Sequence, residues 1–326
     1  MTSSMRKIGF VPQSWLVVLF FFGLTLPGSE WLLATTHSVV FVDGFENGTS
    51  CWWSQSEPPT DCPPQVLEIT IDLPGGETMK LVRISPGTFL MGSREDEHGR
   101  DTDEDLHQVS LTQGFYLGVT EVTQGQWEAV TGSPVDLTCY GGPYGVGPDY
   151  PVYCVSWLDI AGPGGFVEQL NDYLTATDQT GAGLFRLPTE AEWERAARGE
   201  TQTGFSFAAP EDWNVGSCSG FPEADPYMAW CGNNVGQVRL VGSKLPNPYG
   251  LHDMHGNVWE WVQDLWQEHL GYDPVVDPNG PYTGYHHVLR GGGWHAYARN
   301  CRSAARAAYT QGFRGNFTGL RLARSE

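Results

Sequence analysis

Two long strings of residues limit most strongly what this chain can fold into: RLPTEAEWERAARG at Arg186–Gly199 and NPYGLHDMHGNVWEWVQD at Asn247–Asp264. The first predicts a helix that begins after Thr189, because the side chains of Thr189 and Glu192 can each accept a hydrogen bond from the other's backbone amide. The second is a glycine-bearing loop followed by tryptophans. With 41 Gly, 22 Pro and 13 Trp, the chain is expected to be loop-rich, its few regular elements held by large aromatic side chains.

The remaining local patterns predict short elements of both kinds. Residues 66–76 and 79–93 alternate like paired strands, and short helices are predicted at 123–131 and 165–174. The acidic run Arg94–Val109 holds two histidines; we interpret it as a solvated loop, a metal cluster being the alternative. Short helices, strands and long ordered loops together predict an α+β fold, with one domain at 66–326.

The charge balance excludes some partners. The chain has 18 Lys and Arg against 38 Asp and Glu, a net charge of −20. Such a chain repels nucleic acid and anionic membrane surfaces, so neither is expected as a partner. It suits cations, although a merely solubilising acidic surface is the commoner reason for this composition.

The first 34 residues resemble an export signal. Arg6 and Lys7 precede an apolar run at Trp15–Leu26, which is too short to span a bilayer as a helix and of the right length for a signal-peptide core. An uncleaved anchor is the alternative. We therefore expect a protein that is periplasmic or extracellular and leaves the membrane after cleavage, with an N-terminal appendage at 35–65.

Seven cysteines fit an oxidising compartment. Local spacing favours three disulfides, although spacing alone leaves other pairings open. The favoured pairs are Cys51 with Cys62, Cys139 with Cys154, and Cys218 with Cys231. Cys301 is then unpaired, and its simplest interpretation is a buried core thiol.

Five more strings extend the two that open this section. They are GTFLMGS at Gly87–Ser93, FYLGVTEVTQGQWEAVTG at Phe115–Gly132, PVYCVSW at Pro151–Trp157, LRGGGWHAYARNCRSAAR at Leu289–Arg306 and GLRLAR at Gly319–Arg324. In this order the strings resemble the formylglycine-generating enzyme, or sulfatase-modifying factor, domain family. The resemblance covers about Leu67 to Arg324. It implies the sulfatase-modifying-factor fold, a C-type-lectin-like variant with short helices and twisted antiparallel strands.

The same resemblance argues against the family's oxidase chemistry. Family oxidases convert a sulfatase cysteine to formylglycine with copper(I) held by two cysteines after an R-G-G-S motif, and two soft thiolates suit that ion. Here the motif is Arg290-Gly291-Gly292-Gly293, and only one cysteine follows. We therefore expect no copper site. The residues that stand in the active-site region are Trp294, His295, Tyr297, Arg299 and Cys301.

Calcium is the cofactor that the resemblance implies. Oxygen ligands from a tight loop suit this hard ion. Carried over residue by residue, the first site consists of the side chains of Asp253 and Glu260 with the carbonyls of Gly256 and Val258. The weaker second site consists of Asn214, Val215, Asn233 and Val235, where an amide, Asn233, replaces the usual carboxylate. The alternative for Glu260 is a hydrogen-bonding role in the loop without metal.

Other chemistry has weaker signals. His252, His255, His286, His287 and His295 lie near one another in sequence, but His255 belongs to a motif that is structural in the family, which argues against zinc. Trp259, Trp261, Trp266 and Trp294 could stack on sugars, yet we interpret them as core anchors. No phosphate loop, G-x-S-x-G or HExxH motif is present.

These observations favour an exported, calcium-stabilised binding scaffold over an enzyme. Its ligand is expected to be a peptide, protein or carbohydrate, held by loops at Tyr140–Tyr150 and Ser219–Ala229 or near Trp294, with Arg290 and Arg306 at the pocket wall. The alternative is a formylglycine-generating oxidase, or another oxidoreductase acting on a protein or peptide through an atypical site.

Overall fold

The structure is a computed structural model that describes residues 67–326 apart from 180, 182, 211 and 212. The predicted signal at 1–34, the appendage at 35–65 and the pair Cys51 and Cys62 lie outside the described residues. Within the part described, no helix is both long and apolar enough to cross a membrane.

A five-stranded sheet carries the last strand of the chain near its middle. Its order is β1 (Glu68–Asp72), β2 (Thr78–Ile84), β5 (Phe115–Gly118), β12 (Ala323–Ser325) and β6 (Phe185–Arg186). All neighbouring strands in this sheet are antiparallel. The sheet therefore joins strands from both ends of the described chain.

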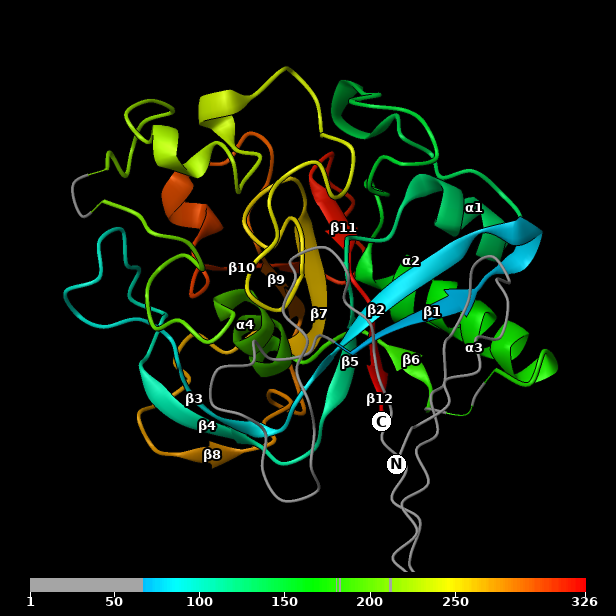
Figure 1. Cartoon of the computed structure of the whole chain (residues 1–326), viewed down its shortest axis with the longest axis horizontal. Coiled ribbons are helices and arrows are strands. Elements are labelled where there is room, and N and C mark those ends of the chain that lie inside the picture. The colour runs from blue at the N-terminus through cyan, green and yellow to red at the C-terminus, as the bar shows by residue number, and fades with distance from the viewer. Residues whose placement is uncertain (1–66, 180, 182, 211–212) are drawn as a thin grey trace, which may run out of the picture. The chain divides into compact units, whose positions relative to one another are not determined.

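Two smaller sheets complete the β-structure (Figure 1). The four-stranded sheet runs β10 (Arg306–Thr310), β9 (His286–Arg290), β7 (Trp259–Leu265) and β11 (Thr318–Leu320). The three-stranded sheet runs β3 (Gly87–Met91), β4 (His107–Leu111) and β8 (Val275–Val276). The pairs β11–β7 and β4–β8 are parallel, so the strands are mixed rather than all antiparallel as expected.

The single strand expected at 79–93 is two strands, β2 and β3, in different sheets. Pro86 lies between them, has no amide hydrogen to donate to a ladder, and interrupts the strand there.

Four α-helices occur in the described residues: α1 (Gln124–Thr131), α2 (Trp157–Ala161), α3 (Phe166–Ala176) and α4 (Glu190–Arg198). Single 3₁₀ turns are η1 (Pro74–Gly76), η2 (Cys139–Gly141), η3 (Pro222–Ala224), η4 (Cys231–Asn233) and η5 (Ala298–Cys301). The predicted capping box of α4 is confirmed, with Thr189 as N-cap and Gly199 as a left-handed C-cap. Thr123 and Ser156 cap α1 and α2 in the same way.

Tryptophans hold these elements together. Trp193 of α4 and Trp261 of β7 have no exposed surface, and Trp259 and Trp294 are also buried. Helix α4 packs against β3, β7 and β9, whereas α1, α2 and α3 gather on one side (Figure 1). The interpretation of the GNVWEW tryptophans as core anchors agrees with this burial.

Two of the favoured disulfides lie in the described residues, Cys139–Cys154 and Cys218–Cys231. Cys301 is a free, buried thiol. Covalent closure of two loops suits an oxidising compartment.

The acidic run 94–109 is not a solvated loop throughout. Glu104, Asp105 and His107 are buried, and His107 begins β4. Glu104 is held by Arg302, from a distant part of the chain, through hydrogen bonds of 2.5 and 2.8 Å. The buried guanidinium makes burial of this carboxylate tolerable.

Candidate functional site

Cys301 lies at the end of η5 inside an aromatic core. Its side chain has no exposed surface and packs in a cluster with Phe205 and Trp230. Burial raises the pKa of the thiol to about 12. At neutral pH the sulfur therefore carries its proton, which is the wrong form for binding a soft metal ion or acting as a nucleophile.

The glycines before Cys301 leave room for this packing. Gly292 has a φ of +81°, and a Cβ built there would meet the Cys301 Sγ at 2.5 Å. A serine or any other side chain at this position would need the thiol to move.

Arg290 and Arg306 are buried in the fold and do not line a binding surface, contrary to expectation. Arg290 donates to the carbonyls of Ser303, Ala304 and Ala305 at 2.6–2.9 Å and pairs with Glu194 of α4. Arg306 pairs with Glu190, also on α4, at 2.6 Å. Both guanidinium groups tie the segment after β9 to this helix, so their role is structural.

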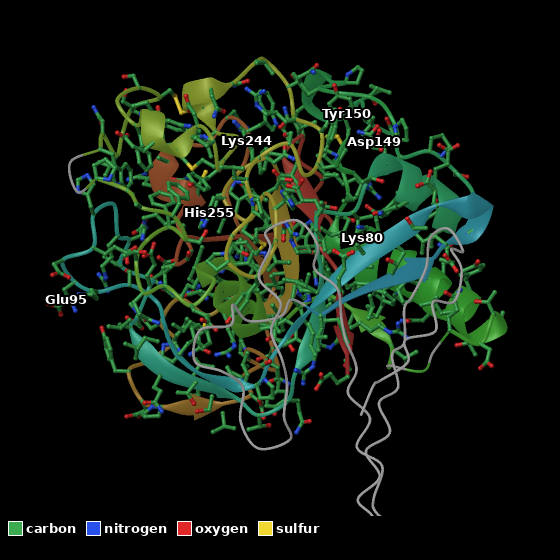
Figure 2. The ribbon with its side chains drawn as sticks, viewed as in Figure 1. Lys80, Glu95, Asp149, Tyr150, Lys244 and His255 are labelled. Carbon is green, nitrogen blue, oxygen red and sulfur yellow. A yellow bond between two sulfur atoms is a disulfide. The ribbon has the colours of Figure 1, made fainter. Side chains whose placement is uncertain are left out.

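His255 is a fixed neutral imidazole beside Cys301. Its Nε2 accepts a hydrogen bond from the Ser206 amide at 3.1 Å, so its Nδ1 carries the proton and donates to the Cys301 carbonyl at 2.8 Å. Burial lowers the pKa of His255 to about 4. Figure 2 shows the residue near the turn η5. Its two ring nitrogens are thus occupied by backbone groups.

The other candidate zinc ligands are dispersed. His252 Nδ1 lies 2.7 Å from the Lys244 carbonyl, and His287 stacks on Trp157. Among the residues that the structure describes, no group of three or more His, Cys, Asp or Glu is arranged to hold a metal ion.

Six aromatic side chains, two of them from the segment after β9, form a closed circuit of contacts, which we call the aromatic ring surface. Its members are Tyr140, Tyr144, Trp294, His295, Phe317 and Phe313. Taken in this order from Tyr144 to Tyr140, neighbouring centroids lie 4.8–6.1 Å apart. The Tyr144 hydroxyl completes the circuit by donating a hydrogen bond to the Tyr140 carbonyl at 3.0 Å.

This surface is partly open to solvent. Tyr140 is 66 % exposed and His295 is exposed, whereas Trp294 is buried at the base, where its indole donates to the Asn316 carbonyl. Tyr297 and Arg299 follow in the chain and are exposed; Arg299 forms no ion pair within the described part of the chain. The Cβ of Arg299 lies close to Gly99, beside Trp213, so the aromatic ring surface itself offers aromatic faces and not this guanidinium group.

The loop expected to hold calcium is tight. Asp253, Gly256 and Asn257 have φ values of 58°, 106° and 61°, all in the left-handed region. Asp253 is buried; its Oδ2 accepts a hydrogen bond from the Gly242 amide at 2.6 Å, and its Oδ1 is buried without a hydrogen-bond partner. An unpartnered buried carboxylate oxygen is costly, and a cation would satisfy it.

Glu260 differs from Asp253. Its Oε1 accepts from Arg321 at 2.8 and 3.0 Å, and its Oε2 accepts from the Trp193 indole at 2.6 Å. Both residues that pair with it are fully buried. The first site therefore fits a cation at Asp253. The negative charge of Glu260 is already balanced by Arg321, which matches the alternative of hydrogen bonding without metal.

A further carboxylate near this loop, that of Glu121, was not predicted from the sequence. It is buried and accepts hydrogen bonds from the Val258 amide at 3.0 Å and the Asn257 side chain at 2.6 Å. Burial, and then the charges of Asp253 and Glu260, raise its pKa well above the usual range. The available signal was an acidic residue inside the strand-like string FYLGVTEV, but nothing local connects it to a loop so distant in the chain.

The residues expected at the second calcium site fit a cation poorly. The Asn233 amide group accepts from the Trp230 amide and donates to Asp225 and to the Met228 carbonyl. The Asn214 Oδ1 accepts from the Gly216 amide, and Val235 is exposed. The side-chain oxygens of this set are engaged in local turns.

Comparisons with known proteins place this geometry in context. Residues 72–326 match the family profile described as the sulfatase-modifying factor enzyme 1-like domain. A formylglycine-generating enzyme from Streptomyces coelicolor is 30% identical over 278 residues, covering 74% of this chain and 88% of that protein. Among solved structures, Treponema denticola variable protein 1 is similar with a TM-score of 0.65 and 28% identity, over 80% of this chain and all of that one (100%). PvdO from Pseudomonas aeruginosa has a TM-score of 0.59 and 26% identity, over 76% and 94%.

Proposed function

We propose, from the premise that this chain belongs to the sulfatase-modifying factor enzyme 1-like family, that it is an exported binding scaffold without copper oxidase activity. The observation that supports this most is Cys301: a single thiol, fully buried, with its pKa raised to about 12. A linear copper(I) site needs two accessible thiolates. The four other cysteines of the described part are in disulfides.

The proposed ligand is a peptide, held on the aromatic ring surface. Aromatic side chains and arginine are enriched at the energetic centres of protein interfaces, because they bury a large area at little cost in conformational entropy. Tyr140 supplies such an exposed ring, and Trp294 supplies a fixed base.

Calcium belongs to this proposal as a stabiliser. Asp253, with the carbonyls of Gly256 and Val258, would hold the ion, which would supply positive charge to the unpartnered Asp253 oxygen. Glu260 would contribute through Arg321 and Trp193 by fixing the start of β7. A loop fixed in this way is a rigid support for neighbouring binding loops.

The test compares copper uptake with ligand binding. Purified protein is titrated with copper(I), and oxygen consumption is followed with a C-x-P-x-R peptide. We expect no stoichiometric uptake and no consumption. Tight copper(I) binding that is lost in Cys301→Ser, with the melting temperature retained, would replace the scaffold by the oxidase alternative.

Peptide binding is tested with a displayed peptide library. Tyr140→Ala should reduce capture of selected peptides at least tenfold, whereas Tyr282→Ala, on a tyrosine that is 94% exposed and outside the ring, should not. Equal capture by both variants and the parent would exclude the aromatic ring surface.

A further inference from the structure

Two cavities are lined by residues of α2, α3 and the turn that joins them. Figure 1 shows these helices together on one side of the fold. The first has a volume of about 430 Å³ and the second about 320 Å³, and Pro163 lines both. Small-molecule sites typically have volumes of about 300–1,000 Å³. The residues of the aromatic ring surface line neither cavity.

Each cavity is lined by a tryptophan that is fixed from behind by a second ring. Trp157 lines the first; it stacks on His287 with centroids 3.9 Å apart at 15°, and its indole donates to the Val262 carbonyl. Trp127 lines the second and stacks on Phe166 with centroids 5.0 Å apart at 9°. Trp157 is half-buried, so its free part is held rigid for a ligand that approaches from the cavity side. Trp127 is only 8% exposed and belongs to the hydrophobic core, so it closes the second cavity without offering a ring face.

The charged groups at the first cavity disfavour an anionic ligand. The guanidinium of Arg186, in the first cavity, is already paired with Glu192 at 2.6 and 2.7 Å. Asp159, in the second, is paired with Arg314 at 2.6 and 2.7 Å. Glu168 therefore gives the first cavity a negative balance, which disfavours phosphate, sulfate or carboxylate groups.

Hydrogen-bonding groups remain available in both cavities. The Gln263 amide in the first cavity forms no side-chain hydrogen bond within the described residues. Glu168 uses one oxygen to accept from the Gly164 amide at 2.7 Å, which leaves its other oxygen. Gln169, in the second cavity, donates to the Gly164 carbonyl at 2.8 Å, which leaves its amide oxygen.

We propose that the two cavities are adjacent subsites for a neutral oligosaccharide, one sugar ring on Trp157 in the first and the next beside Gln169 in the second. The apolar C–H face of the first pyranose stacks on the indole of Trp157, and the hydroxyl groups can donate to Glu168 and Gln169 and exchange hydrogen bonds with Gln263. A quaternary ammonium ligand fits less well, since it is bound by several aromatic faces and the two cavities provide one, that of Trp157.

The turn at Gly162–Gly165 is the ridge between the subsites. Gly164 is exposed, has a φ of +72° and has no atom within 4 Å of a Cβ built there. Its amide and carbonyl are held by Glu168 and Gln169, one residue from each cavity. A ligand that spans the ridge would contact both of these side chains, so binding at one subsite raises the effective concentration of the linked sugar at the other.

The experiment measures binding of defined sugars to the full chain by isothermal titration calorimetry. The probes are β-linked glucose, mannose and N-acetylglucosamine oligomers of one, two and four units, with sulfated oligomers and choline as comparisons. We expect at least one neutral tetramer to bind ten or more times more tightly than its monomer. Preference for a sulfated oligomer or choline, or no neutral oligomer binding at millimolar concentration, would overturn the proposal.

Variants locate the site. Gln263→Ala should weaken binding of the tetramer at least fivefold and leave the fold intact, since the Gln263 side chain forms no hydrogen bond to the described residues. Trp157→Phe should weaken it tenfold. Gln267→Ala, on an exposed glutamine outside both cavities, is the matched control. Unchanged affinity in Gln263→Ala and Trp157→Phe, with both proteins folded, would show that the sugar binds elsewhere. Copper(I) uptake and peptide capture are measured separately, so failure here leaves the scaffold proposal intact.

Discussion

At the scale of single residues, several carboxylates are buried at a cost to stability. Asp264 is 4% exposed, and its Oδ2 accepts from the Glu190 amide at 2.8 Å. Burial, and then the nearby Glu190 charge, raise the pKa of Asp264 to about 8. The folded protein therefore holds a proton that the unfolded chain, with a pKa near 3.8, has lost at neutral pH.

The sign of the pH dependence follows from this difference. The stabilising proton of Asp264 is fully effective below pH 3.8, and its contribution falls as the pH rises to about 8. Asp264→Asn keeps an oxygen acceptor and cannot ionise. We expect its melting temperature to exceed that of the parent at pH 8 and to approach it at pH 4.5, measured by circular dichroism. A constant difference across this range would contradict the shifted pKa.

Asp253 and Glu260 should respond differently to calcium. If Asp253 binds the ion, calcium at a hundredfold excess over Kd stabilises the fold by about 2.7 kcal/mol. Asp253→Asn should abolish the rise in melting temperature on adding calcium. Glu260→Gln should lower the melting temperature with and without calcium, because it leaves the buried Arg321 guanidinium without its charge partner.

The readout is thermal unfolding in chelator and in calcium for the parent and both variants. Loss of the calcium response in Glu260→Gln alone would instead place the ion at Glu260. A parent that melts at one temperature in both solutions would remove calcium from the proposal.

At the scale of elements, the best-specified structures are those encoded within a few residues. The helix α4 is capped by Thr189, whose hydroxyl accepts from the Glu192 amide at 3.1 Å, while the Glu192 carboxylate accepts from the Thr189 amide at 2.8 Å. Most of this helix is buried, and it packs against three strands. A change at its N-terminal cap is therefore expected to alter the free energy of unfolding of the whole domain.

Removing this cap should have a measurable cost. Thr189→Ala is expected to lower the free energy of unfolding by about 1 kcal/mol in urea. The matched control is Thr175→Ala in α3, where the exposed hydroxyl only donates to the carbonyl four residues earlier. That change should stay within about 0.5 kcal/mol of the parent. Equal losses in the two variants would argue against a capping role.

Local encoding also explains which expectations were right. The capping box of α4 and the pairs Cys139–Cys154 and Cys218–Cys231 are short-range features and were predicted. The burial of Glu104 was not predicted, because its partner Arg302 is 198 residues away. The ion pair between Arg321 and Glu260, and the hydrogen bonds that Glu121 accepts from the loop after Asp253, were not predicted for the same reason. Charged residues in a loop carry no local sign of a distant buried partner.

At the scale of the whole described fold, buried arginines connect segments that are remote in sequence. Arg290 joins the segment after β9 to α4, Arg302 joins it to the acidic run, and Arg321 joins the C-terminal segment to β7. Each of these side chains is at most 2% exposed. A buried ion pair adds little net stability over an apolar pair, but loss of one partner costs about 3–5 kcal/mol. Such pairs hold a loop-rich chain to one arrangement.

The last strand makes the same connection through its backbone. Ala323 of β12 is fully buried and pairs with Leu117 of β5 on one side and with Arg186 of β6 on the other. Ala323→Pro introduces a residue without an amide hydrogen into a buried strand with a neighbour on each side, and a buried acceptor left without its donor costs about 1–3 kcal/mol. Since domains of this kind have a total stability of about 5–15 kcal/mol, we expect the variant to fold with a clearly lowered melting temperature, followed by near-ultraviolet circular dichroism. Thr70→Pro, in the edge strand β1, tests the same residue type where only one neighbour, β2, is present. Its melting temperature should fall less, and equal losses from the two prolines would contradict a central role for β12.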